Sequence, residues 1–140
     1  MVKKIIHVWT DGSYNKELKI YASAFYVENN NTAGVEVAKD EYGGRNVSGE
    51  CFAVIKAIDY CIDTFGKDII IVINHDFIGL SNWYYHEWEG RSEISHKYLD
   101  ALKSRPPETD LIFNKVKAHS GERFNNLVDA LCTDALKEKK

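Results

Sequence analysis

The chain is organised around the stretch K-I-I-H-V-W-T-D-G-S-Y, residues 4–14. It begins as an apolar run rich in β-branched side chains, which predicts a buried strand. The acid Asp11 and the turn-forming pair Gly12-Ser13 follow at once, so we expect the strand to end there. A carboxylate at the end of a buried strand needs a cation, a positive partner or several donors, unless it merely caps a turn. Asp11 therefore becomes a site candidate only if further acids meet it.

Length and composition predict one ordinary globular domain. The 140 residues are 44% hydrophobic and 28% charged, and they contain no repeat, linker or low-complexity segment. We expect residues 1–140 to form a single domain with no further domain before Lys3. The net charge of −3 argues against a strongly basic, non-specific nucleic-acid binder. It does not exclude a nucleic-acid enzyme, because a site built from acids carries negative charge that bound cations neutralise.

Cysteine usage and the N-terminal residues predict an intracellular protein. The three cysteines are widely spaced and form no C-x-x-C pair, which favours reduced thiols over disulfides or a structural zinc site. No apolar signal-peptide core follows Met1, and no run approaches the length of a membrane-spanning helix. We therefore expect a cytoplasmic protein without a membrane partner, and a monomer.

Hydrophobic periodicity predicts an α/β domain with a five-stranded mixed sheet flanked by helices. Strands are expected over residues 4–11, 19–28, 32–42, 68–73 and 111–117. Helices are expected over residues 48–65, 77–88, 92–103 and 122–139. Short polar turns make the first three strands antiparallel. The helix that follows them brings the fourth strand back parallel to the first.

Four acids are expected at the rim of the core. Asp11 ends the first strand, and Asp76 follows the fourth strand, which a right-handed crossover places beside the first. Glu50 lies in the first turn of the crossover helix, on the face that carries its apolar stripe. Asp129 borders the apolar face of the last helix. These positions predict that the four carboxylates meet.

Each acid also has a simpler interpretation. Glu50 could favour the helix dipole, Asp76 could cap the next turn, and Asp129 could be solvated. Together in a partly buried site, however, the four charges would repel one another strongly, and divalent cations would remove that repulsion. Ligands that are all oxygen suit Mg²⁺ or Mn²⁺. The acids therefore predict a two-metal site for phosphoryl transfer.

Four motifs stand in order along nearly the whole chain: T-D-G-S-Y at residues 10–14, R-N-V-S-G-E at 45–50, H-D-F-I-G at 75–79, and K-V-K-A-H-S-G at 115–121 followed by Asn125 and Val128-Asp129. Together they resemble ribonuclease H type 1. The similarity is closest to the bacterial catalytic domains that usually follow a hybrid-binding domain, whose short aromatic segment resembles residues 83–88.

The resemblance implies a ribonuclease-H-like fold and an endonuclease that hydrolyses the RNA strand of RNA/DNA hybrids to give 5′-phosphate products. One metal ion would activate a water and a second would stabilise the leaving 3′ oxygen. Two Mg²⁺ ions, with Mn²⁺ as a substitute, would be held by Asp11, Glu50, Asp76 and Asp129. His119 would complete the catalytic set by assisting proton transfer or product departure. Contacts to the hybrid are implied for Ser13, Asn15, Asn46 and Asn125.

Two features depart from the family pattern. Phe77 follows Asp76 where many members have serine, and residues 81–93 hold three glutamates and only one arginine where some relatives carry a basic protrusion that grips DNA. Two other functions stay open: a catalytically silent module of this fold that binds nucleic acid or protein, and a nuclease of this fold that cuts DNA. The presence of all four acids, the S-G-E helix start and the A-H-S-G loop favour the ribonuclease. The aromatic residues 83–88 could stack on bases, but packing against the core is the simpler expectation.

Overall fold

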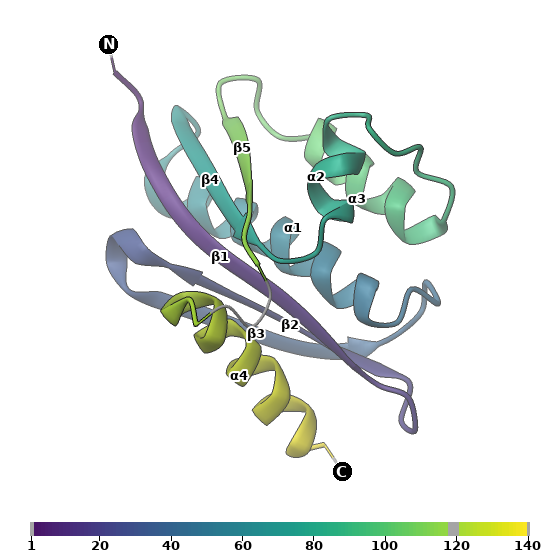
Figure 1. The fold of residues 1–140 in the computed structure, drawn as a ribbon. Coiled ribbons are helices and arrows are strands. Elements are labelled where there is room, and N and C mark those ends of the chain that lie inside the picture. The colour runs from purple at the N-terminus through teal and green to yellow at the C-terminus, as the bar shows by residue number, and fades with distance from the viewer. Residues whose placement is uncertain (1, 118–120, 140) are drawn as a thin grey trace.

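A five-stranded mixed sheet forms the centre of the computed structural model, which describes residues 2–117 and 121–139 (Figure 1). The strand order is β3-β2-β1-β4-β5. The strands are β1 (Lys4–Asn15), β2 (Ile20–Val27), β3 (Thr32–Lys39), β4 (Ile69–His75) and β5 (Asp110–Lys115). The helices are α1 (Asn46–Phe65), α2 (Gly79–Tyr84), α3 (Glu93–Lys103) and α4 (Arg123–Lys137), and the short 3-10 turn η1 (Glu28–Asn30) joins β2 to β3. The predicted mixed sheet with antiparallel and parallel pairs is confirmed.

The central strand β1 pairs with a different neighbour on each side. It runs antiparallel to β2 as far as Asn15 and parallel to β4 only as far as Trp9, which lies opposite Asn74. The fourth strand is short and almost wholly β-branched, so it lies buried in the middle of the sheet between β1 and β5. Beyond Trp9 one side of β1 is therefore free of β4, and side chains can gather there.

Helices cover both faces of the sheet (Figure 1). On one face α1, α2 and α3 bury the larger core, which includes Ile6, Val8 and the alternate isoleucines of β4. On the other face α4 packs against β1, β2 and β3 through Val128 and Cys132. Among the residues that the structure describes, no helix is long and apolar enough to cross a membrane.

The prediction that the first strand ends at Asp11 is wrong. Strand β1 continues through Gly12-Ser13 to Asn15, because β2 remains paired with it along this whole length. Gly12 serves close packing and not a turn: a Cβ at this position would overlap the backbone of Gly49 and Glu50 where α1 crosses the strand. The glycine of this Gly-Ser pair is therefore explained by contact with α1, which is formed by residues far along the chain.

The crossover helix begins earlier than predicted. It starts at Asn46, so Glu50 lies in the second turn and not in the first. This position removes the interpretation of Glu50 as a charge placed in the first turn for the helix dipole, since the effect fades beyond that turn. The first part of the aromatic segment packs, as expected: Trp83 lies edge-on against Phe77 and Tyr98, with ring centroids 5.8 and 6.2 Å apart, whereas Tyr85 is 49% exposed. Trp88 remains 44% exposed.

Candidate active site

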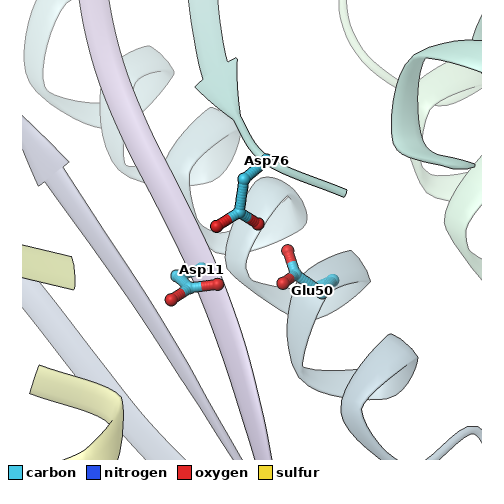
Figure 2. A group of neighbouring side chains, drawn as sticks. All are labelled: Asp11, Glu50 and Asp76. Atoms are coloured by element: carbon cyan, nitrogen blue, oxygen red, sulfur yellow. The ribbon is translucent and has the colours of Figure 1, made fainter. Parts of the chain in front are cut away.

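Asp11 and Asp76 lie level with each other where β4 leaves the sheet. The last paired residues of the two parallel strands are Trp9 and Asn74, so each acid stands two positions beyond the pairing. Glu50 reaches the same place from α1, and Figure 2 shows its side chain close to those of Asp11 on β1 and of Asp76, which directly follows β4. One carboxylate oxygen from each of the three lies within 4.8 Å of the others.

Close helix packing accounts for the position of Glu50. Gly12 on β1 faces Gly49 on α1, and a Cβ on Gly49 would crowd the backbone oxygen of Ala22 and the Cα of Gly12. Two glycines in contact let the helix backbone approach the sheet closely, which carries the next residue, Glu50, to the edge of β1. Asp11 and Glu50 are each only 5% exposed, whereas Asp76 is half-buried.

Burial makes ionisation of this group difficult. Burial raises the pKa of Asp11 from 3.8 to about 7, against a hydrogen bond with Glu50 that lowers it, and the charges of Asp76 and Asp129 raise it further. Burial and then the charge of Asp11 raise the pKa of Glu50 well above its usual value. Without a cation, burial therefore opposes the loss of a proton from Asp11 and from Glu50.

The donor set fits a divalent cation. All three residues offer oxygen, and Oε2 of Glu50 is buried without a hydrogen-bond partner among the described residues. A buried carboxylate oxygen that lacks a donor is costly unless a cation coordinates it. Oxygen ligands of this kind suit Mg²⁺ or Mn²⁺, so Asp11, Glu50 and Asp76 are the residues that would hold the ion.

Asp129 does not join this group of three within 4.8 Å. It is half-buried on α4, next to Val128, which packs α4 against the sheet. Its charge nevertheless raises the pKa of Asp11, so it lies within electrostatic reach of the site. The structure therefore brings together three of the four predicted acids, and a metal-binding role for Asp129 stays a prediction.

The other predicted residues lie in different surroundings. Asn125 is buried at the start of α4, with Nδ2 3.5 Å from Oδ2 of Asp76, so it contacts the acidic group. Asn15 Oδ1 accepts hydrogen bonds from the backbone N–H groups of Glu17 and Leu18, and it therefore holds the β1–β2 turn. Ser13 is half-buried on β1 and Asn46 is exposed. Their substrate contacts stay predictions. His119 lies outside the described residues.

Sequence reasoning missed His75 as a residue of the site. Its imidazole is fully buried at the end of β4, directly before Asp76, and its Nδ1 lies 3.0 Å from the backbone oxygen of Phe77. Burial lowers the pKa of His75 to about 4, so the ring is neutral near pH 7. The sequence offered one signal for His75: it is a polar residue at the end of the most apolar strand, directly before the candidate ligand Asp76.

Comparison with known proteins assigns the chain to a family. The family model of RNase H matches residues 3–137. The crystal structure of RNase H1 from the halophilic archaeon Halobacterium salinarum NRC-1 superposes with a TM-score of 0.77 at 19% identity, covering 96% of this chain and 98% of that chain. The N-terminal RNase H domain of Rv2228c from Mycobacterium tuberculosis, solved as a fusion with maltose-binding protein, gives 0.79 at 11% identity, covering 97% and 96%.

A search of curated protein sequences gives no match. At such low identities the two solved structures show that the fold is shared, and the family model supplies the assignment over almost the whole chain. The resemblance carried by the four sequence motifs is thereby confirmed: the chain belongs to the RNase H family.

Proposed function

We propose that this protein is an endonuclease that hydrolyses the RNA strand of RNA/DNA hybrids with two divalent cations, Mg²⁺ or in its place Mn²⁺. The observation that carries the proposal is the convergence of buried Asp11 and Glu50 with half-buried Asp76 where β4 separates from the central strand β1. Two buried carboxylates whose ionisation the fold opposes, Asp11 and Glu50, are better explained by cation binding than by stability. Membership of the RNase H family supports the same chemistry.

The residues of the site would have different roles, according to where each one lies. Asp11 and Glu50 would form the buried wall of the metal centre, and half-buried Asp76 would face the substrate side. Bound divalent ions supply the activation of a water and the stabilisation of charge on the reacting phosphate. Asn125 would orient Asp76 or the hybrid backbone, and Asp129 and His119 would complete the catalytic set.

Binding of the hybrid is expected to be weak and sensitive to salt. The chain carries a net charge of −3, and the segment of residues 85–93, with Glu87, Glu89 and Glu93, offers only Arg91 as a cation, which pairs with Glu89 at 2.9 Å. Phosphate contacts supply most of the affinity in protein–nucleic acid complexes, so a segment whose one cation is already paired adds little to it.

Cleavage of end-labelled substrates tests the function. The purified chain is incubated with RNA/DNA hybrid, double-stranded RNA and duplex DNA of one sequence, with Mg²⁺ or with chelator. We expect cutting of the RNA strand of the hybrid only, dependent on Mg²⁺, with 5′-phosphate ends that a ligase accepts. Equal cutting of duplex DNA would assign the chain to DNA-directed nucleases of this fold. Hybrid binding without any cleavage would make it a silent nucleic-acid-binding module.

A further inference from the structure

His75 occupies an unusual position for a buried polar side chain. The ring is fully buried, and its Nδ1 lies 3.0 Å from the backbone oxygen of Phe77. A carbonyl oxygen can only accept a hydrogen bond, so Nδ1 carries the proton and the ring is the Nδ1–H tautomer. Its Nε2 is then an acceptor, and it has no hydrogen-bond partner among the residues that the structure describes.

The hydrogen bond from His75 to Phe77 spans the candidate metal ligand Asp76. On one side of Asp76, the backbone oxygen of His75 accepts from the N–H of Val116 at 2.7 Å. On the other side, the backbone oxygen of Phe77 accepts both from the His75 ring and from the N–H of Leu80 at 3.2 Å. Both neighbouring peptide groups are therefore held, and they fix the backbone from which the Asp76 side chain leaves.

The carboxylate itself has little else to direct it. Its one hydrogen bond among the described residues is the long contact of 3.5 Å from Asn125 Nδ2. The carboxylate is half-buried, so packing alone leaves its direction less constrained than those of Asp11 and Glu50. The direction of Asp76 toward its two partners thus depends on the backbone turn that His75 closes.

Stability does not explain the imidazole. A buried Nε2 without a donor costs free energy that an apolar side chain of similar size would avoid. The ring lies edge-on against Phe113, with centroids 5.7 Å apart, so its surroundings would accommodate such a side chain. The feature of the imidazole that leucine lacks is the Nδ1–H donor.

We propose that His75 is a positioning residue whose Nδ1–H bond to the Phe77 carbonyl directs the Asp76 carboxylate toward Asp11 and Glu50 and so sets the affinity for the divalent cation. The inference deepens the proposed function, because it rests on the three acids holding metal. Groups that orient metal ligands without touching the metal commonly change affinity by about 10- to 100-fold.

Three substitutions separate the donor from the ring. In His75→Asn the side-chain nitrogen can occupy the place of Nδ1, in His75→Gln it can occupy that of Nε2, and His75→Leu has no donor. We expect Mn²⁺ binding, measured by electron paramagnetic resonance and by calorimetry, to weaken about 10-fold or more in the Leu and Gln variants. The Asn variant should bind within about threefold of wild type, because it can restore the bond. Phe113→Leu is the matched control: it loosens packing on the same ring and should lower the melting temperature while leaving Mn²⁺ affinity near wild type.

Equal Mn²⁺ affinity in wild type and the Gln variant would overturn the inference, as would an Asn variant as weak as Gln. If the His75→Leu variant fails to fold, the difference in Mn²⁺ affinity between the Asn and Gln variants still tests the inference. Side-chain ¹⁵N chemical shifts should show a protonated Nδ1 on His75, and a protonated Nε2 would also contradict it. Failure of the proposed function looks different: the wild type would bind Mn²⁺ through a donor-dependent site and yet leave hybrids uncut.

Discussion

Replacing Asp11 by Asn is expected to stabilise the protein when no divalent cation is present. Burial, together with the charges of Asp76 and Asp129, raises the pKa of Asp11 to about 7, so the fold favours its protonated form. Asparagine has nearly the same shape and carries no charge. It therefore removes the desolvation cost and the repulsion while leaving a polar group beside Glu50.

The magnitude follows from the pKa shift. A change from 3.8 to about 7 corresponds to a cost to wild type of at most about 4 kcal/mol at pH 8, where Asp11 is ionised in both states. At pH 5 the folded protein keeps the proton that the unfolded chain has largely lost, so the cost is about 1.5 kcal/mol. The contribution of Asp11 to the stability of wild type is thus greatest below its unfolded pKa and is lost as pH rises through about 7.

Urea unfolding with a chelator at pH 8 and pH 5 measures this difference. The gain of Asp11→Asn over wild type should be largest at pH 8 and less than half as large at pH 5. Asp134→Asn, an exposed acid on α4, is the matched control and should change little at either pH. Saturating Mg²⁺ should stabilise wild type and have much less effect on the variant. An Asp11→Asn variant no more stable than wild type at pH 8 would refute the reasoning, and so would a gain independent of pH.

Three further predictions concern the packing and protonation of the site. Gly12→Ala places a Cβ on the backbone of Glu50 and should lower the unfolding free energy by about 2 kcal/mol or more. Urea titration measures this loss, and an unchanged unfolding midpoint would contradict the close packing of α1 on β1. Mg²⁺ affinity should rise as pH increases through about 7, because the buried acids must lose protons to bind the ion. Calorimetry in buffers of different ionisation enthalpy should detect proton release on binding at pH 6. The absence of proton release would contradict the raised pKa of Asp11. Tyr98→Phe removes a hydrogen bond of 2.8 Å to a backbone oxygen in α2 and should lower the unfolding free energy by about 1–2 kcal/mol without affecting Mn²⁺ binding. A change in Mn²⁺ affinity would contradict this prediction and show that α2 is coupled to the site.

The topology could be predicted because it depends on local patterns. Alternation in the early strands, the apolar stripe of α1 and the β-branched run of β4 each determine one element, and chain order then constrains their arrangement. The meeting of Asp11 and Asp76 follows from the parallel pairing of β1 with β4. The predictions succeeded where a pattern of neighbouring residues carried the information.

The errors arose where distant parts of the chain act on one position. Gly12 was interpreted as a turn because its two immediate neighbours suggest one, whereas the packing of α1 explains the glycine. Asp129 lies outside the group of three acids because of how α4 packs across the sheet, and its role as a metal ligand stays a prediction. His75 was not recognised as a residue of the site, since its hydrogen bond to Phe77 appears only when the backbone turns there.

Single-turnover cleavage of an RNA/DNA hybrid by wild type and by Asp11→Asn, Glu50→Gln and Asp76→Asn tests the central claim, that these three acids form a metal centre for RNA hydrolysis. With saturating Mg²⁺, the wild type should cut the RNA strand. Each variant should fold, bind the hybrid, and show no detectable cleavage. A wild type that does not cut the hybrid, or any one variant that keeps a rate constant within about tenfold of wild type, would contradict it.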